Sequence, residues 1–366
     1  MKILIIGPIP PPINGCSYAN FILCKNLLQK GYKCKTINTS TKTISSKQGN
    51  SFSFKKAFSF LKIYFSVFKI INATAIYFTP GQTFFGVLKY SPFILFCILY
   101  RKPYVIHVHG NYLGKQYHEL KGIKKSIFKY LISNASVGIV LSESLKSNFE
   151  ELLDFSKIVI VENFVEDGIY TSTNEITKPN DKLRIVYLSN LMKEKGILEL
   201  LNALIQLKEK NIDFEALIAG GIEHDIENEV NQKLSVLKNY VQYLGIVQGH
   251  EKYKILTESN IFILPTYYKM EGQPISILEA MATGNIIVAT PHGGIPDIIS
   301  KQNGYLIKSE SPLSIVECLE KISDNIVQQT DFFSRHNMEY AKRNFTEKIF
   351  TDKILAVFEG LNNNKC

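Results

Sequence analysis

Two glutamates in the segment EGQPISILEA (271–280) are the residues of this sequence best suited to do chemistry. Pro274 fits the first turn of a helix, because its fixed φ is helical and its missing N–H lies where no intrahelical bond forms. Glu279 would then lie about one and a half turns into a helix that is apolar on most sides. A buried carboxylate needs a polar partner. The segment therefore predicts that Glu279, together with Glu271 in the loop before the helix, holds such a partner.

A lysine and three glycines follow other apolar runs. Lys195 and Gly196 lie where a loop meets a helix, and an ammonium group at that point can reach a diphosphate beside the helix N-terminus. The alternative is a lysine in solvent. Gly220 and Gly221 either let a ligand approach the backbone closely or form an ordinary tight turn.

The N-terminal half offers weaker signals. Gly15 precedes an amphipathic helix whose N–H groups could face an anion or a sugar hydroxyl, although a Pro-rich turn and a helix cap also explain it. The G-x-G-x-x-G pattern of a nicotinamide site is missing. His107 and His109 end one apolar run on the same side, because side chains alternate along a strand. One of them can face a cleft, or both can be hydrogen-bonded core residues, and without a third ligand they do not indicate a metal site.

Short β-rich runs alternate with amphipathic segments throughout the chain. The runs are 2–7, 34–38, 75–78, 104–109, 137–142 and 158–163, followed by 183–189, 214–220, 241–245, 261–265, 286–290 and 304–307. This alternation predicts an α/β protein with two Rossmann-like doubly wound domains that face across a cleft. Ligands of such sheets bind at the carboxyl ends of the strands, so the loops after the strands carry the chemistry.

The predicted domains cover residues 1–168 and 169–345. The polar segment 166–182 has no apolar period and is interpreted as a linker. The chain after Ser311 is interpreted as helical, with a last helix at about 346–366 that packs back on the first domain.

Charge, cysteine usage and the lengths of the apolar stretches favour a cytoplasmic protein without a transmembrane helix. The 366 residues carry a net charge of +9, and residues 1–168 hold 21 Lys and Arg against 8 Asp and Glu. Six scattered cysteines fit a reducing cytoplasm, and the N-terminus is interpreted as a strand rather than a signal peptide. The longest apolar stretch, 84–100, contains Lys89 and Pro92 and is shorter than the roughly 20 residues that span a bilayer.

A basic stripe occurs in the apolar segment 51–72. Lys55, Lys62 and Lys69 repeat every seven residues, with Ser59 and Ser66 between them. The stripe is either the solvent face of a helix packed on a sheet or a surface that docks on an anionic membrane.

The motifs together resemble the family 4 retaining glycosyltransferases, which have the GT-B fold. The resemblance covers nearly the whole chain and is strongest in EGQPISILEAMA (271–282), where the two glutamates have the spacing E-x7-E. Lys195–Gly196, the IAGG of 218–221 and VATPHGGIPDII (288–299) are similar to further motifs of the family.

The resemblance implies a role for each residue of the motif. Glu279 would bind the ribose hydroxyls of a sugar nucleotide, and Glu271 would contact the donor sugar beside the reacting centre. The first turn of the helix would meet the donor phosphates. The candidates are therefore Glu271, Lys195 and His109 as catalytic residues, and Glu279, Gly15, Asn190, Gly220, Gly221, Gln273, Pro274, Ile275 and Ser276 as donor-binding residues.

The chain departs from the family pattern at three points. Asn190 stands where the family usually has an arginine of the diphosphate clamp, and Lys193 is the nearest substitute for its charge. Asp297 replaces a glutamate, and a single Gly15 followed by Cys16 replaces the usual Gly-Gly. These differences affect leaving-group stabilisation and contacts with the acceptor.

The resemblance implies sugar transfer with retention at the anomeric carbon, without a metal or other cofactor. The expected donor is a UDP-sugar and the expected acceptor a glycan or lipid-linked glycan of bacterial surface polysaccharide. The expected location is the cytoplasm or the inner face of its membrane. A GT-B sugar-nucleotide epimerase is the main alternative. A nucleic-acid-binding protein is disfavoured, because the basic residues are not interleaved with a known DNA or RNA motif.

Overall fold

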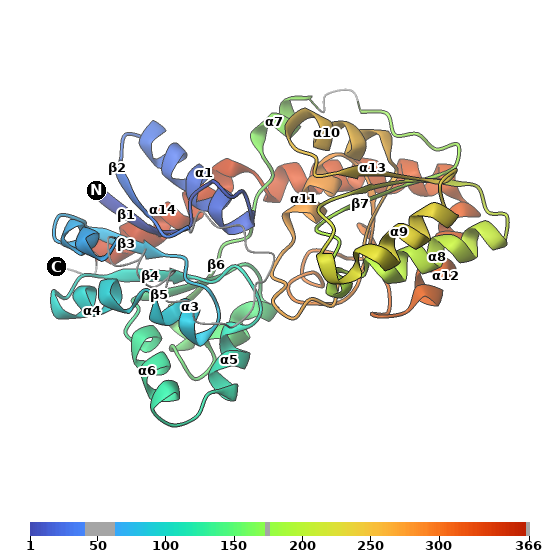
Figure 1. Cartoon of the computed structure of the whole chain (residues 1–366). Coiled ribbons are helices and arrows are strands. Elements are labelled where there is room, and N and C mark those ends of the chain that lie inside the picture. The colour runs from blue at the N-terminus through green and yellow to red at the C-terminus, as the bar shows by residue number, and fades with distance from the viewer. Residues whose placement is uncertain (41–62, 173–175, 364–366) are drawn as a thin grey trace. The chain divides into compact units, whose positions relative to one another are not determined.

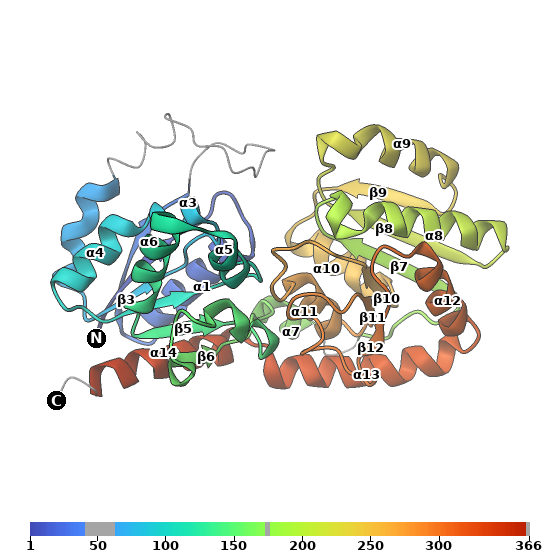
Figure 2. The ribbon, with the colours of Figure 1, turned by 90° about the horizontal axis from the view of Figure 1, so that it is seen from below.

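The structure, a computed structural model, describes residues 1–40, 63–172 and 176–363 (Figures 1 and 2). It divides into two units. The first contains Met1–Asn163 and Glu347–Cys366, and the second contains Phe164–Thr346. Each unit has a hydrophobic core of its own.

Six parallel strands form the sheet of the first unit. They are β1 (Lys2–Gly7), β2 (Lys33–Asn38), β3 (Ala75–Phe78), β4 (Tyr104–His107), β5 (Val137–Val140) and β6 (Ile158–Ile160). Their order is β2-β1-β3-β4-β5-β6. Strands β3 and β4 are buried along their whole length, as expected when helices cover both faces of a parallel sheet. The six predicted strands of this half are confirmed, but β4 and β5 end two residues early and β6 ends three residues early. His109 therefore lies in the loop after β4.

Helices cover this sheet on both sides. They are α1 (Gly15–Gln29), α3 (Phe84–Leu88), α4 (Ser91–Leu99), α5 (Leu113–Glu119), α6 (Gly122–Ser133) and α14 (Glu347–Asn363), with the 3-10 helices η1 (Phe65–Ile70), η2 (Ser144–Phe149) and η3 (Phe155–Lys157). A capping box between Asn14 and Ser17 starts α1. The C-terminal α14 packs against α1 and β3, where the rings of Phe358 and Tyr77 are 5.9 Å apart.

Most of the predicted basic stripe lies outside the described residues. Lys55, Ser59 and Lys62 belong to this part of the chain. The described continuation forms η1, a 3-10 helix rather than an α-helix, with Lys69 exposed. In the described parts of the chain, every helix is too short or too polar to cross a bilayer.

A second sheet of six parallel strands forms the second unit. Its strands are β7 (Leu183–Leu188), β8 (Phe214–Ala219), β9 (Val241–Gly245), β10 (Ile261–Leu264), β11 (Ile286–Ala289) and β12 (Gly304–Leu306). Their order is β12-β11-β10-β7-β8-β9. All six coincide with predicted runs to within one residue at each end. The chain runs from β7 to β8 on one side, whereas β10 lies on the other side of β7, so the strand order reverses between β7 and β10.

The helices of this unit are α7 (Asp167–Ser172), α8 (Ile197–Glu209), α9 (Glu227–Val236), α10 (Gly249–Glu258), α11 (Ile275–Ala282), α12 (Pro312–Ser323) and α13 (Ile326–Asn344), with the 3-10 helices η4 (Lys193–Lys195) and η5 (His224–Ile226). Figure 1 shows α8, α9 and α12 on one face of the sheet and α10 and α13 on the other. The predicted helical nature of the chain after Ser311 is confirmed.

Two local predictions are wrong. The segment predicted as a linker begins with α7, because Ile169 is buried and the hydroxyl of Tyr170 donates to the carbonyl of Ala341 at 2.9 Å. Further along, Lys178 is buried and donates to the carbonyl of Leu256 at 2.6 Å. Pro274 precedes α11 instead of lying in its first turn, since its ψ of 120° is extended although its φ of −64° would suit a helix.

Candidate functional site

The candidate site lies at the carboxyl edge of the second sheet. In open α/β sheets, ligands bind outside the carboxyl ends of the strands where the strand order reverses. Here that point lies between β7 and β10. Lys195 follows β7, and Glu271 follows β10. The two loops that leave this point therefore carry two of the three predicted catalytic residues.

Lys195 and Glu271 form an ion pair. Lys195 Nζ lies 2.6 Å from Glu271 Oε2, and the two side chains are 15% and 8% exposed. Thr266 Oγ1 donates to the same carboxylate oxygen at 2.9 Å. Lys195 Nζ also lies 5.1 Å from the ring centroid of Tyr268, within cation–π range. A single ammonium group thus neutralises a buried carboxylate and remains partly open to solvent.

A glycine fixes the place of Lys195. Gly196 has a φ of +75°, and a Cβ there would lie 2.2 Å from the carbonyl oxygen of Pro265. Only glycine allows this approach, so the loop after β7 closes directly onto the end of β10. The backbone N–H of Tyr267 also donates to the carbonyl of Glu194 at 2.7 Å. These contacts hold Lys195 next to the strand that leads to Glu271.

The loop after β11 supports Glu271 from the other side. Gly294 donates its N–H to the carbonyl of Gly272 at 2.8 Å. Gly293 has a φ of +58°, and a Cβ there would lie 2.5 Å from the carbonyl oxygen of Glu271. The GG of VATPHGGIPDII therefore lets two loops meet at the backbone behind the glutamate.

Glu279 is buried in α11, as the sequence predicts, and its partner is Lys252 of α10. Lys252 Nζ lies 2.5 Å from Glu279 Oε1 and 3.3 Å from Glu166 Oε1. Burial raises the pKa of Glu279, and Lys252 opposes this rise. The pKa of Lys252 is raised in turn, because the two glutamates outweigh the effect of its own burial.

Lys252 was not among the residues selected from the sequence. A signal was available, because Lys252 precedes the buried Ile255 by three residues and the buried Leu256 by four. Residues at these spacings share one face of a helix. An ammonium group on the inward face of α10 needs a buried carboxylate, and Glu279 is that carboxylate.

The start of α11 carries backbone N–H groups that could face a ligand. No side chain caps this end, where Pro274, Ile275 and Ser276 are each partly exposed. The first N–H groups of a helix have no intrahelical partner, and the helix dipole favours an anion beside them. Gln273, one residue earlier, is buried. The structure thus places these four predicted residues between Glu271 and Glu279, at the entrance of the helix.

Two further loops complete the carboxyl edge. Gly220 follows β8 with a φ of +143°, and a Cβ there would lie 1.8 Å from the carbonyl oxygen of Ser189, so this glycine serves backbone packing. Gly221 has more room, because a Cβ there would lie 3.5 Å from the nearest atom, which belongs to the side chain of Ile246. Asn190 and Lys193 are exposed in the loop after β7, and the Asn190 carbonyl accepts from the hydroxyl of Tyr187 at 3.1 Å.

The remaining predicted residues, Gly15 and His109, lie in the first unit. Gly15 is the exposed first residue of α1. His109 stacks on His107 with ring centroids 4.1 Å apart, and His107 Nδ1 lies 2.5 Å from the hydroxyl of Tyr77. Burial lowers the pKa of His109 to about 4, so its imidazole is neutral near pH 7. Among the described residues, neither Nε2 atom of the pair has a hydrogen-bond partner.

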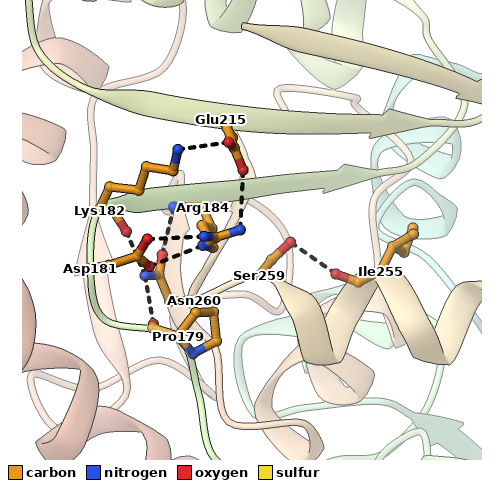
Figure 3. Close-up of polar contacts among 8 residues, drawn as sticks. All are labelled: Pro179, Asp181, Lys182, Arg184, Glu215, Ile255, Ser259 and Asn260. Carbon is orange, nitrogen blue, oxygen red and sulfur yellow. Dashed lines mark hydrogen bonds and ion pairs between the residues drawn. The ribbon is translucent and has the colours of Figure 1, made fainter.

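A separate polar cluster lies at the opposite edge of the second sheet, at the amino ends of β7 and β8 (Figure 3). Arg184 donates to Asp181 at 2.9 Å and to Glu215 at 3.1 Å, and Lys182 donates to Glu215 at 2.6 Å. A cavity of about 780 Å³ adjoins the cluster. The charges of the cluster pair with one another and fasten the start of β7, so we assign the cluster a structural role.

Most of the second unit matches the model of a known protein family. Residues 170–345 match the family of glycosyl transferases group 1. The putative teichuronic acid biosynthesis glycosyltransferase TuaC of Bacillus subtilis (strain 168) is 28% identical over 226 residues, which are 60% of this chain and 54% of TuaC. The chain thus matches about half the length of that relative.

Solved structures resemble the whole chain. The Anabaena protein HepE, crystallised in complex with UDP, has a TM-score of 0.73 at 15% identity and covers 98% of this chain and 100% of its own. A glycosyltransferase from Rickettsia africae ESF-5 has a TM-score of 0.75 at 18% identity and covers 99% of each chain. These likenesses confirm the predicted GT-B fold. The family match covers residues 170–345, slightly less than half of the chain, and these residues include Lys195, Glu271 and Glu279 of the second unit.

Proposed function

We propose that this protein transfers a sugar from a UDP-sugar to a hydroxyl group of an acceptor, with retention at the anomeric carbon. The observation that carries the proposal is the ion pair of Lys195 and Glu271, at the point where the strand order of the second sheet reverses. The start of α11 follows Glu271, and the same helix holds Glu279, which pairs with Lys252. A cation for a diphosphate and two carboxylates for sugar hydroxyls are the groups that a sugar nucleotide requires.

Glu279 would bind the ribose of the donor. An ionised carboxylate only accepts hydrogen bonds, and its two oxygens can take both hydroxyls of a diol. Lys252 Nζ contacts Oε1. That contact opposes the rise in the pKa of Glu279 that burial causes, and a carboxylate has further lone pairs that could accept from the ribose hydroxyls.

The departing diphosphate would be met by Lys195 and by the first turn of α11. Negative charge grows on the diphosphate as the glycosidic bond breaks, and fixed donors at that position lower the barrier. Lys195 would turn from Glu271 toward the phosphates, while the N–H groups of Ile275 and Ser276 face them from the helix start. Asn190 and Lys193, exposed beside Lys195, are the candidates to supply the rest of the clamp.

Glu271 would face the donor sugar. Thr266 holds one of its oxygens, and the carboxylate is then placed to accept from sugar hydroxyls and to stabilise positive charge at the anomeric carbon. In the retaining step, the bond from the anomeric carbon to the phosphate oxygen breaks, and the acceptor oxygen bonds to the carbon on the same face. The acceptor proton passes to the departing phosphate oxygen. His109 and Gly15 of the first unit are proposed to serve the sugar and acceptor side.

The choice of uridine and of the acceptor rests on relatives. HepE was crystallised with UDP, and TuaC is named for teichuronic acid biosynthesis. We therefore propose a glycan or lipid-linked acceptor of surface-polysaccharide synthesis, used on the cytoplasmic side of the membrane. We also propose that no metal takes part, since Lys195 and helix dipoles supply the positive charge.

Thermal unfolding with UDP, GDP and ADP tests donor binding. A ligand at 100 times its dissociation constant stabilises a protein by about 2.7 kcal/mol, a readily measured shift. We expect stabilisation by UDP, and stabilisation by GDP alone would reject the choice of base. Incubation with UDP-sugars and NMR of the product then report the anomeric configuration. Release of an epimerised sugar nucleotide, with no transfer, would identify an epimerase instead.

A further inference from the structure

One helical layer of the first unit carries an unusual number of exposed apolar side chains. Helices η1, α4 and α6 pack over the same face of the first sheet, with α4 next to both of the others (Figures 1 and 2). Large apolar side chains are exposed on all three. They are Phe65, Phe68, Ile71, Leu95, Leu99, Tyr100, Ile123, Ile127 and Tyr130. We call these residues the outer helical surface.

The exposed apolar residues of α4 lie on the side of the helix that faces away from the core. In α4, Phe93, Ile94 and Cys97 point into the core, whereas Leu95 and Leu99 lie one turn apart on the opposite side of the helix. Leu99 is 75% exposed. The helix is therefore apolar all round, although the described residues cover only one side of it, and such a helix calls for a further apolar partner.

Helix α6 repeats this arrangement. Phe128, Leu131 and Ile132 face the core, and Ile123, Ile127 and Tyr130 form a second apolar stripe at spacings of four and three residues. Ile123 is 76% exposed. Two neighbouring helices of one layer thus each present an outward apolar stripe, which is more exposed apolar side chain than scattered single residues would give.

Positive charge surrounds these stripes. Lys69, Arg101, Lys121, Lys124 and Lys129 are all exposed on or beside the three helices. Residues 1–118 contain 15 Lys and Arg and no Asp or Glu, and α6 itself has no acidic residue. The partner of this surface must therefore combine an apolar layer with negative charge.

An anionic lipid bilayer has this combination of properties, with acyl chains beneath acidic headgroups. A nucleic acid would meet the lysines but leave the leucine and isoleucine stripes in water. A second copy of the chain would bring the same positive charges together. We infer that the outer helical surface binds an anionic membrane, with the apolar stripes entering the headgroup region and the lysines meeting the lipid phosphates.

This inference concerns the first unit and does not depend on the proposed sugar transfer. Binding of the full chain to vesicles tests it, by co-sedimentation with phosphatidylcholine vesicles that contain or lack phosphatidylglycerol, at low and at high salt. We expect binding to the vesicles with phosphatidylglycerol, weakened by salt because the charges are screened. Absence of binding at low salt would overturn the inference, whether or not UDP binds the second unit.

Substitutions on and beside α6 test whether the outer helical surface makes the contact with the vesicles. Ile123→Glu/Ile127→Glu should lower vesicle binding at least tenfold, and Lys121→Gln/Lys129→Gln should lower it about fivefold for each lysine removed. Val327→Glu/Phe332→Glu on α13 is the matched control, because these apolar residues are also exposed but lie in the second unit. The control should bind vesicles as the unchanged protein does.

Two results would contradict the assignment. The first is equal loss of binding in the α13 control and in the α6 variant. The second is a dimer in sedimentation that Ile123→Glu/Ile127→Glu abolishes without any vesicle binding, which would assign the surface to self-association. Circular dichroism of each variant checks that the chain remains folded, since all three pairs of substitutions replace exposed residues.

Discussion

Lys195 Nζ lies 2.6 Å from Glu271 Oε2, although the two residues are 76 positions apart in the sequence. The pair joins the loops after β7 and β10, where the order of the second sheet reverses. Both side chains are largely buried, so neither charge is well solvated without the other. The finding makes Lys195 a residue with two roles, as the counter-ion of Glu271 in the free protein and as the proposed partner of the departing diphosphate.

Lys195→Met should lower turnover by about 10²-fold, the scale expected when a stabiliser of the leaving group is lost. It should also lower the unfolding temperature, because Glu271 becomes a buried charge without its cation. Steady-state kinetics and calorimetry measure the two effects.

A second substitution separates these two roles. Lys195→Met/Glu271→Gln should regain stability, since both charges are gone, without regaining turnover. Lys238→Met is the control, because Lys238 is exposed between α9 and β9, outside the loops that hold Lys195 and Glu271. Turnover that is lost equally in Lys238→Met and Lys195→Met would reject the special role of Lys195.

Glu279→Gln should weaken UDP affinity about tenfold or more. Hydrogen bonds to a charged group are worth about 1.5–3 kcal/mol each, and the amide keeps the shape without the charge. Glu271→Gln should instead lower turnover while UDP affinity changes little, because UDP lacks the sugar that Glu271 is proposed to face. Isothermal titration with UDP and kinetics with the intact donor distinguish the two outcomes. Equal losses of UDP affinity would show that the roles are divided wrongly.

Lys252→Met should shift the pH dependence of UDP binding to higher pH. Burial raises the pKa of Glu279, and Lys252 opposes this rise. Removing Lys252 therefore raises the pKa of Glu279 further, and the ionised form that accepts the ribose hydroxyls disappears earlier as the pH falls. As the pH is lowered from about 8 to about 5, the loss of UDP affinity should begin at a higher pH in Lys252→Met than in the unchanged protein. Lys252→Arg keeps the charge and should follow the unchanged protein, and identical profiles for all three proteins would speak against this coupling.

Chelation by EDTA should leave sugar transfer unchanged. The proposed step takes its positive charge from Lys195 and from the start of α11, so removal of divalent ions removes none of the groups involved. The measurement is the initial rate before and after dialysis against EDTA. A rate that falls on dialysis and returns with Mg²⁺ or Mn²⁺ would show that a metal belongs to the site.

The sequence was sufficient for whatever depends on neighbours along the chain. Apolar runs of strand length with helical spacers predicted both sheets, because burial on both faces requires such runs. The position of Glu279 in an apolar helix predicted its burial, and Gly196 was correctly placed where a loop meets a helix. The polar composition of 166–182 led to the wrong prediction of a linker, because two residues, Ile169 and Tyr170, anchor α7 to the second unit.

Only the tertiary structure decided which distant groups meet. The register of the parallel strands and the reversal between β7 and β10 bring Lys195 to Glu271, and the packing of α10 on the same sheet brings Lys252 to Glu279. The outward stripes of α4 and α6 were likewise hidden in the sequence, where core and surface residues of an apolar helix look alike. Side-chain spacing fixes the face of one element, but the partner of that face depends on how the elements pack.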